Sequence, residues 1–248
     1  MARTGRFVAS IEARMGSTRL PGKALMEIMG VPMLELLIER LKGAKNLDDI
    51  VIATSINIKD DALEALAKRI GVKCFRGSEE DVLKRVLEAA HFAKADHIVE
   101  IWGDTPLLDP KIIDHAIEFY HTHEYDCIGT LEKAYPLGMS LLIFPTKVLA
   151  EVDLITQDPI DRENVSNYIY EHPKHFEVCD LPCPENLRRP DVRLTVDEAP
   201  DLELVRKLFE ALRPKNPFFD TKDILDYLNR HPQLLDINKA VKQKVLRV

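Results

Sequence analysis

The chain of 248 residues has few cysteines and no pattern that would pair them. Its four cysteines, Cys74, Cys127, Cys179 and Cys183, are too few for the disulfide framework of a secreted scaffold. Cys179 and Cys183 have no second metal-spaced pair and no nearby pair of histidines, so a zinc site is not indicated. We therefore expect reduced thiols and a cytoplasmic protein.

Long apolar runs and an excess of positive charge are also missing. No apolar segment reaches the roughly 18 residues of a membrane span, and residues 1–6 lead into a strand without the apolar core of a signal peptide. Lysine and arginine number 34 against 41 acidic residues, which gives a net charge of −7. Nucleic acids and anionic membranes require a basic face, so we expect neither as a partner.

Against this acidic background, one basic loop follows the first apolar run. Arg14, Arg19 and Lys23 lie within ten residues of each other, among Gly16, Ser17, Thr18 and Gly22. Glycines let backbone N–H groups approach an anion closely, and the cations form charge-assisted hydrogen bonds with phosphate oxygens. The loop is therefore typical of a phosphate site, although a basic surface loop with no ligand is the alternative.

The loop is not that of a P-loop kinase or ATPase. Five residues separate Gly16 from Gly22, where the P-loop motif has four. Ala24 also occupies the position at which a P-loop serine or threonine binds magnesium. A small anionic ligand, held by a different arrangement, fits the sequence better.

Apolar strand-like runs alternate with amphipathic segments through the first half of the chain. This alternation predicts an α/β fold with a mainly parallel sheet, helices on both faces and a ligand at the carboxyl ends of the strands. The expected strands are 6–10, 49–54, 73–75 and 97–101, and the expected helices are 32–42, 60–70, 79–93 and 111–122.

From residue 125 onward the alternation changes. We expect strands at 126–128, 141–144, 176–180 and 193–197, and helices at 145–152, 161–170, 200–212 and from 221 onward. No linker-like composition or internal repeat interrupts the chain. We therefore predict one domain over residues 1–248, in which 125–190 is an inserted lid or dimerisation region and 213–248 is a helical tail.

Two aspartates follow expected strands and are candidates for a metal site. Asp104 comes after the run 97–101, and Asp197 ends the run 193–197. Magnesium prefers oxygen ligands and commonly bridges a few carboxylates to phosphates, so the two residues could face the basic loop across one cleft. The alternatives are that Asp104 caps the next helix and that Asp197 only begins the helix after it.

The run from Ala13 to Lys23, A-R-M-G-S-T-R-L-P-G-K, resembles the signature A-R-x-x-S-x-R-L-P-G-K of the sugar-acid cytidylyltransferases. That family includes acylneuraminate and 3-deoxy-manno-octulosonate cytidylyltransferases, and this chain is most similar to the spore-coat polysaccharide branch. The further segments that resemble this branch, in the same order, are 75–83, 103–110, 168–173 and 193–198.

The resemblance implies a Rossmann-like fold of the nucleotide-diphospho-sugar transferase type. It also implies magnesium-dependent transfer of CMP from CTP to a sugar acid, with release of pyrophosphate, by a homodimer. By this analogy Arg14, Lys23 and Asp104 are catalytic, and Asp104 and Asp197 hold Mg²⁺. The implied nucleotide-binding residues are Ala9, Ser10, Ala13, Arg14, Ser17, Arg19, Lys23, Arg76 and Ser78.

The acceptor is the least defined part of this expectation. The family branch has acidic residues after its Tyr-Pro-x-Gly motif, whereas this chain has Met139-Ser140-Leu141-Leu142. A nonulosonic or other 2-keto-3-deoxy acid is our first choice, and a small acceptor bearing phosphate or phosphonate is a second. A nucleotide-sugar glycosyltransferase and a non-catalytic nucleotide-binding protein are further alternatives. The candidate acceptor contacts are Tyr135, Arg162, Asn164 and Arg189.

Overall fold

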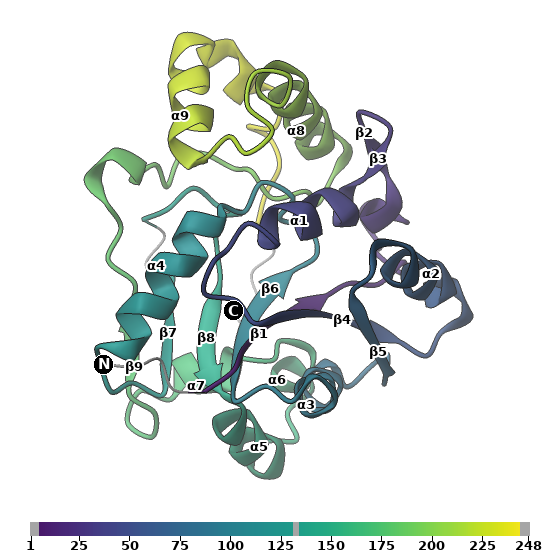
Figure 1. Ribbon diagram of the computed structural model, residues 1–248, viewed down its shortest axis with the longest axis vertical. Helices are drawn as coiled ribbons and strands as arrows, with labels where there is room; N and C mark the ends of the chain where they lie inside the picture. Colours follow the sequence, from purple (N-terminus) through teal and green to yellow (C-terminus); the bar gives the residue numbers. More distant parts are fainter. Residues whose placement is uncertain (1–4, 131–133, 244–248) are drawn as a thin grey trace.

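The computed structural model describes residues 5–130 and 134–243 of the chain. A seven-stranded sheet forms its centre, in the order β5-β4-β1-β6-β8-β7-β9 (Figure 1). Its strands are β1 (Phe7–Glu12), β4 (Asp49–Ser55), β5 (Lys73–Gly77), β6 (His97–Trp102), β7 (Cys127–Gly129), β8 (Leu142–Pro145) and β9 (Val178–Asp180). A separate hairpin joins β2 (Glu27–Ile28) to β3 (Val31–Pro32).

The sheet is mainly parallel, as the sequence predicts. Within the described residues, β8 is the strand that runs against its two neighbours, β6 and β7. The remaining pairs, β5–β4, β4–β1, β1–β6 and β7–β9, are parallel. The carboxyl ends of β1 and β6 therefore lie side by side, which places the basic loop next to Asp104.

Helices cover both faces of this sheet. They are α1 (Met33–Leu41), α2 (Asp61–Ile70), α3 (Val82–Ala93), α4 (Pro110–His121), α5 (Thr146–Ile155), α6 (Pro159–Glu163), α7 (Asn167–Glu171), α8 (Ala199–Leu212) and α9 (Thr221–Arg230). Short 3-10 turns are η1 (Lys23–Leu25), η2 (Ile58–Asp60), η3 (Glu185–Leu187) and η4 (Pro232–Asp236).

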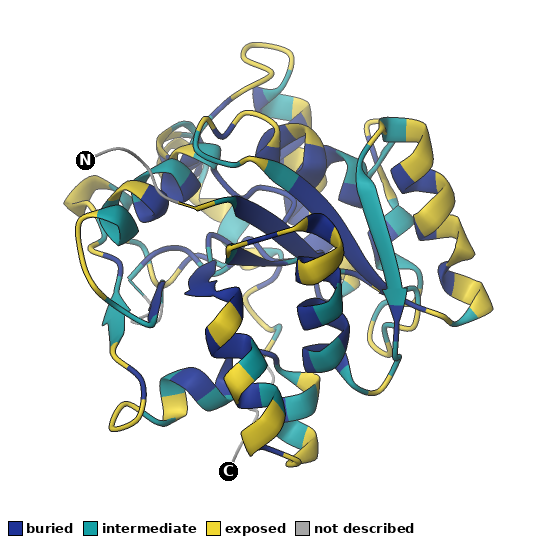
Figure 2. Ribbon diagram, turned by 60° about the horizontal axis from the view of Figure 1, so that its bottom comes forward, coloured by how far each residue is buried: buried dark blue, intermediate teal, exposed yellow. Residues whose placement is uncertain are grey.

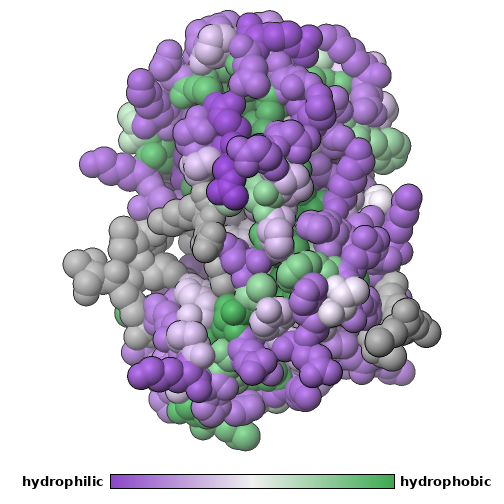
Figure 3. Space-filling model, turned by 90° about the vertical axis from the view of Figure 1, so that its left-hand side faces the viewer, coloured by the Kyte–Doolittle hydropathy of each residue, from purple (hydrophilic) through white to green (hydrophobic). Residues whose placement is uncertain are grey.

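Two apolar clusters divide the helices between the faces. The larger cluster joins one face of the sheet to α1, α2, α4, α8 and α9. The smaller cluster joins the other face to α3, α5 and α7. The inner strands are buried and the edge strands β5 and β9 are mostly intermediate, while the helices alternate buried and more exposed positions along their length (Figure 2). The face in Figure 3 is mostly hydrophilic, and its apolar areas are small and separate.

The range 125–190 contributes β7, β8 and β9 to the same central sheet. It also contributes α5, α6 and α7 to the α3 side of the molecule. Its role as a lid or dimer contact stays a prediction, as does the division of the chain into one domain with an insertion.

Three expected elements differ in the structure. The helix expected at 79–93 begins at Val82, because the Asp81 side chain accepts a hydrogen bond from the backbone N–H of Lys84, at 3.0 Å, and caps the helix there. The helix expected at 161–170 is two short helices, α6 and α7, because α6 ends at Asn164, whose backbone is not helical.

The strand expected at 193–197 is wrong. This segment lies beyond the edge of the sheet and forms one isolated bridge, between Arg193 and Leu137. Its backbone is instead tied to two loops: Leu194 donates to Leu137 O at 2.7 Å, and Val196 donates to Asp104 O at 2.8 Å. The apolar residues of the segment fill the core between loops, a role that the sequence pattern does not distinguish from that of a short strand.

Candidate active site

The basic loop leaves the end of β1 and closes on itself. Gly22 has a φ of +73°, a left-handed conformation that favours glycine, and its N–H donates to Met15 O at 3.1 Å. The backbone N–H of Leu20 donates to Ser17 Oγ at 3.3 Å. This folding brings Arg14, Arg19 and Lys23 to the lining of one cavity.

Lys23 connects the loop to both candidate metal carboxylates. Its ammonium Nζ lies 2.7 Å from Asp104 Oδ2 and 3.3 Å from Asp197 Oδ1, and it donates to Val196 O at 2.9 Å. Because both carboxylates contact the same nitrogen, they face one point in space. The side chain of Lys23 is 16% exposed, so water screens these ion pairs little.

Asp197 is held by two further cations. Arg19 Nη2 lies 2.7 Å from Asp197 Oδ1, and Arg193 Nη2 donates to Asp197 Oδ2 at 2.6 Å. Burial by itself would raise the pKa of Asp197, but Lys23, Arg193 and Arg19 outweigh it and keep this pKa below its ordinary value. Asp197 is therefore ionised at neutral pH.

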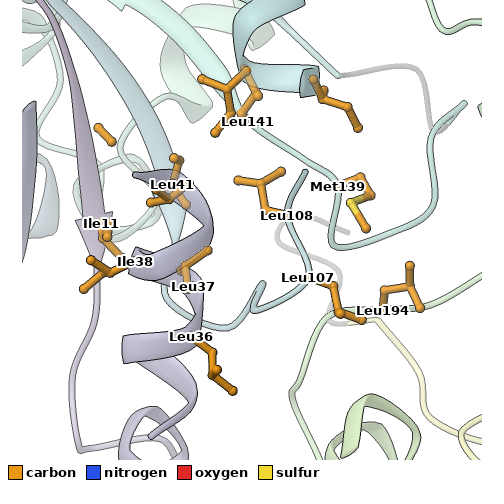
Figure 4. Packing of buried hydrophobic residues seen from close by; sticks show 14 of the residues in the cluster. Ile11, Leu36, Leu37, Ile38, Leu41, Leu107, Leu108, Met139, Leu141 and Leu194 are labelled. Carbon is orange, nitrogen blue, oxygen red and sulfur yellow. The ribbon is translucent and has the colours of Figure 1, made fainter. Parts of the chain in front are cut away.

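Buried apolar residues fix where the two carboxylates lie. Leu107 and Leu108 follow Asp104 and are fully buried, and Leu194 and Val196 precede Asp197 in the same cluster. Figure 4 shows Leu108 between the α1 side chains and Met139, with Leu107 close to Leu194. The carboxylates thus project from well-packed loops.

A glycine allows the Asp104 loop to approach β1. The N–H of Gly103 donates to Glu12 O at 2.9 Å. A Cβ at this position would lie 2.8 Å from the same oxygen, so a larger residue would push the loop away.

The structure decides against the capping alternatives for both aspartates. The cap of α4 is Asp109, whose side chain accepts from the backbone N–H of Lys111 at 2.9 Å. The cap of α8 is Glu198, which forms a capping box with Asp201. The side chains of Asp104 and Asp197 are therefore directed to Lys23 and the cavity.

The cavity has a volume of about 280 Å³ and a largely polar lining. It lies between the basic loop, the end of β6 and the start of α3. Its lining residues are Glu12, Ala13, Arg14, Ser17, Thr18, Arg19, Lys23, Ala24, Val82, Arg85, Trp102, Gly103, Asp104, Glu163, Asn164 and Asp197.

The chemistry of these residues fits a divalent cation shared with a ligand. No group of three or more histidine, cysteine or acidic residues placed to hold a metal occurs within residues 5–130 and 134–243. Asp104 and Asp197 form a pair, and magnesium is often bound by one or two carboxylates together with phosphate oxygens and water. The Lys23 ammonium already occupies a point that both carboxylates can reach.

The sequence prediction did not include a pair of glutamates at the cavity: Glu12 lines the cavity, and Glu100 is buried. They lie on neighbouring strands, close enough for their carboxyls to interact. Burial and their mutual repulsion raise the pKa of Glu12 well above its ordinary value, and burial raises the pKa of Glu100. The pair therefore holds a proton where isolated glutamates would have lost theirs. The sequence signal was a glutamate inside the apolar run of each strand.

Arg85 of α3 lies in the same buried layer. Its guanidinium donates to Ser78 O and holds the loop before α3 in place. Burial lowers the pKa of Arg85. The positive charge of Arg85 acts to lower the pKa of Glu12 and so offsets part of the effect of burial.

Four of the expected nucleotide residues lie outside the cavity lining. Ala9 and Ser10 are buried within β1. Arg76 forms ion pairs with Asp61 and Glu64, and Ser78 Oγ accepts from the N–H of Asp81 at 3.0 Å. Ala13, Arg14, Ser17, Arg19 and Lys23 do line the cavity.

Of the four candidate acceptor residues, the cavity contains Asn164. Tyr135 is buried and its hydroxyl donates to Pro182 O at 3.1 Å. Arg162 pairs with Asp81 and Asp153, and Arg189 pairs with Asp191. These three side chains already have protein partners away from Asp104 and Asp197.

The stretch 139–142 is part of the core. Met139, Leu141 and Leu142 are buried, and Met139 Sδ accepts from Thr221 Oγ1 at 3.6 Å.

Comparison with known proteins agrees with this geometry. The model of the cytidylyltransferase family matches residues 8–240, almost the whole chain. The chain belongs to the cytidylyltransferase family. The matched range includes the basic loop and both aspartates.

Relatives of this cytidylyltransferase come from bacteria and archaea. An uncharacterised protein of Methanocaldococcus jannaschii is 39% identical over 98% of each chain. The spore coat polysaccharide biosynthesis protein SpsF of Bacillus subtilis is 34% identical over 90% of this chain and 93% of SpsF. A 3-deoxy-manno-octulosonate cytidylyltransferase of Geobacter metallireducens is 38% identical over 45% of this chain and 43% of the enzyme.

Solved structures confirm the expected fold. A cytidylyltransferase from Leptospira borgpetersenii superposes with a TM-score of 0.86 and 28% identity, covering 97% of this chain and 98% of that one. The Rossmann-like nucleotidyltransferase fold inferred from sequence is thus confirmed. None of the described helices has the length and apolar character needed to span a membrane.

Proposed function

We propose that this cytidylyltransferase transfers CMP from CTP to a hydroxyl of a sugar acid, with magnesium as cofactor and release of pyrophosphate. The observation that carries the proposal is the contact of Lys23 with Asp104 and Asp197 at the edge of the basic loop. Three cations and two carboxylates line one cavity, which supports binding of a triphosphate together with a metal. A nonulosonic or other 2-keto-3-deoxy acid is the proposed acceptor.

The basic loop would bind the triphosphate. Arg14, Arg19 and Lys23 supply positive charge, and the Ser17 hydroxyl supplies a further hydrogen bond. Ala13 would lie against the nucleotide through its backbone. As the bond between the α- and β-phosphates breaks, negative charge grows on the departing pyrophosphate, and Lys23 and Arg14 would stabilise it.

Asp104 and Asp197 would hold the metal. A bound Mg²⁺ would neutralise phosphate charge and draw the acceptor oxygen towards the α-phosphate. In the structure Lys23 and Arg19 already neutralise these carboxylates. We therefore expect an exchange of partners, in which the two cations turn to the triphosphate when the carboxylates bind the metal.

The reaction forms a bond between the acceptor oxygen and the α-phosphorus and breaks the bond to the β-phosphate. The acceptor hydroxyl loses one proton. Positioning of the two substrates in one cavity, together with the fixed charges, would supply most of the rate acceleration.

The choice of a sugar acid rests on the names of the relatives. One relative acts on 3-deoxy-manno-octulosonate by its name, and SpsF is named for spore coat polysaccharide biosynthesis. The homodimeric state, the cytoplasmic location, and the roles of Ala9, Ser10, Arg76 and Ser78 in nucleotide binding stay predictions.

The decisive experiment is product analysis. The protein is incubated with CTP, MgCl₂ and a panel of sugar acids and phosphorylated small molecules, and pyrophosphate and CMP conjugates are measured by coupled assay and mass spectrometry. We expect pyrophosphate with CTP and a CMP–sugar acid product. A CMP conjugate formed only with phosphate- or phosphonate-bearing acceptors would change the acceptor class. Transfer from a nucleotide sugar without triphosphate would favour a glycosyltransferase, and no turnover across the panel would favour a non-catalytic relative.

A further inference from the structure

A second cavity adjoins the first at the two aspartates. Its volume is about 220 Å³, and it lies on the side of the residue 137–140 loop and the end of the described chain. It shares Trp102, Asp104 and Asp197 with the first cavity. Its remaining lining residues are Thr105, Leu137, Gly138, Ser140, Thr195 and Gln243.

Asp104 and Asp197 therefore lie between two cavities whose linings differ in chemistry. The first space contains the phosphate-binding cations Arg14, Arg19 and Lys23. The described lining of the second contains hydroxyl groups, an amide and the indole of Trp102 instead. In a transfer between two substrates, each space can hold one of them, with the reacting atoms meeting at the carboxylates they share.

Gln243 reaches the second cavity because the end of the described chain is anchored beside the site. Asn238 is buried and donates to Arg193 O at 3.1 Å and to Asp201 Oδ1 at 2.9 Å. Four residues later, the carbonyl of Lys242 accepts from Arg19 Nη1 at 3.4 Å. The tail thus touches the same two arginines that hold Asp197.

The orientation of the Gln243 amide follows from its partner. Arg193 Nη1 donates to Gln243 Oε1 at 2.7 Å. An arginine has no acceptor, so the amide oxygen must face it and the NH₂ group lies on the other side of the amide. Among the described residues this NH₂ group has no hydrogen-bond partner, so its two donors can bind a ligand in the second cavity.

We propose that the acceptor binds in this second cavity and that Gln243 is a specificity-determining residue, its NH₂ group donating to the acid group of a polyhydroxylated acid. The proposal rests on the proposed function and adds the acceptor's position and orientation. In a 2-keto-3-deoxy acid the acid group and the reacting anomeric hydroxyl are bonded to the same carbon, so the acid group faces Gln243 while it stays next to that hydroxyl. The reacting hydroxyl lies towards the two carboxylates, and the indole of Trp102 supplies an apolar wall.

Two substitutions at one position test the donor role. Gln243→Glu keeps the shape and the contact with Arg193 but replaces the NH₂ donors with a negatively charged oxygen. Gln243→Ala removes the side chain. Lys239→Ala is the matched control in the same tail, because the Lys239 side chain is 80% exposed and faces Asp236 at 3.7 Å.

Initial rates of pyrophosphate release are measured with MgCl₂ and CTP, with 3-deoxy-manno-octulosonate and N-acetylneuraminate as acceptors. We expect Gln243→Glu to raise the acceptor KM about tenfold or more, because a hydrogen bond to a charged group is lost and replaced by repulsion. Gln243→Ala should raise it about fivefold. The KM for CTP should stay within twofold in both variants and in Lys239→Ala.

The fluorescence of Trp102, the one tryptophan in the chain, reports binding of each substrate separately. A change on adding CTP with MgCl₂, followed by a second change on adding the sugar acid, is expected for the wild type. The second change should weaken in Gln243→Glu while the first remains. Circular dichroism confirms that the variants are folded.

The outcomes separate the two proposals. An acceptor KM for Gln243→Glu equal to that of the wild type overturns the role of Gln243 while leaving CMP transfer intact. A wild type that binds CTP but neither binds nor uses either sugar acid overturns the acceptor class. A chain that gives no response to CTP overturns the proposed function itself.

Discussion

Lys23 forms ion pairs with both carboxylates that we propose as ligands of the metal. Its Nζ contacts Asp104 and Asp197 within 3.3 Å, and Arg19 adds a second cation to Asp197. Two like charges facing one point would repel each other without these partners. The ligand-free site is therefore electrostatically balanced, and ligand binding has to exchange its ion pairs.

Asp104→Asn is expected to abolish most CMP transfer while leaving the protein folded. Asparagine keeps the shape of the side chain, and the main-chain contacts of Asp104 with Val196 and Thr195 do not depend on the carboxylate. Loss of a charged metal ligand costs several kcal/mol of transition-state stabilisation, so we expect kcat to fall about 100-fold or more. The measurement is pyrophosphate release at saturating CTP.

The control for this variant is Asp191→Asn. Asp191 is 60% exposed and pairs with Arg189 away from the cavity, so its activity should match the wild type. An Asp104→Asn protein that retains activity within fivefold of the wild type would remove Asp104 from the metal site.

Glu100→Gln is expected to reduce the pH dependence of stability. A carboxyl whose pKa is raised by folding keeps its proton where the same carboxyl in the unfolded chain has lost it. The free energy of unfolding of the wild type therefore falls as the pH rises above the ordinary value of 4.5, towards the raised pKa values of Glu12 and Glu100. Glutamine does not titrate, and it removes the repulsion that acts on Glu12.

Urea unfolding at pH 5 and pH 8 measures this effect. The loss of stability between the two pH values should be smaller in Glu100→Gln than in the wild type. Glu203→Gln, at an exposed position on α8, should behave as the wild type. Equal pH dependence in all three proteins would contradict a raised pKa of Glu100 in the folded state.

At the scale of elements, α6 and α7 form a support for one wall of the first cavity. The short α6 brings Glu163 and Asn164 to the lining. It is fixed to α3 by Arg162, which donates to both carboxylate oxygens of Asp81, the cap of α3. A position that seemed suited to an acceptor contact therefore joins two helices.

Arg162→Met is expected to act on stability more than on substrate binding. The variant keeps the apolar stem but leaves Asp81 and Asp153 without this partner. Because Arg162 is only 12% exposed, we expect a loss of about 2 kcal/mol in the free energy of unfolding. The KM values for CTP and acceptor should stay within about twofold.

Arg188→Met is the comparison variant, since Arg188 and its partner Glu185 are both largely exposed and the change should cost less than about 0.5 kcal/mol. A large rise in the acceptor KM of Arg162→Met at unchanged stability would restore Arg162 as an acceptor residue.

At the scale of the whole molecule, the order of the strands assembles the site. β1 and β6 are neighbours in the sheet although about 90 residues separate them in sequence. The segment that carries Asp197 then passes over their ends and is tied to the Asp104 loop through Val196. Three distant parts of the chain, together with its tail, thus meet at the carboxyl ends of β1 and β6.

CTP and magnesium together are expected to raise the melting temperature. A ligand present at 100 times its Kd adds about 2.7 kcal/mol to the stability of the folded state. For a chain of this length, this corresponds to about 5–10 °C. Thermal unfolding is followed with CTP alone, with MgCl₂ alone, with both, and with CTP and a chelator.

The two ligands should stabilise more together than the sum of their separate effects, because the carboxylates release Lys23 and Arg19 only when a cation replaces these side chains. An equal shift for CTP with MgCl₂ and for CTP with chelator would show that nucleotide binding does not use the metal.

The sequence by itself determined the elements and the chemical nature of the site. Apolar periodicity identified most helices and strands, because burial of one face leaves a regular pattern. The glycines and cations between Arg14 and Lys23 indicated a phosphate site, since few other ligands require that composition. The resemblance then indicated Asp104 and Asp197 as its acidic partners.

Only the tertiary structure decided which side chains are available to a ligand. Arg162 and Tyr135 have the right chemistry for an acceptor contact, but their partners Asp81 and Pro182 come from distant parts of the chain and leave no local pattern. The raised pKa values of Glu12 and Glu100 arise from burial and strand pairing, and Gln243 reaches the site through the packing of Asn238. Local sequence records composition and period, whereas burial and pairing depend on which distant segments the fold brings into contact.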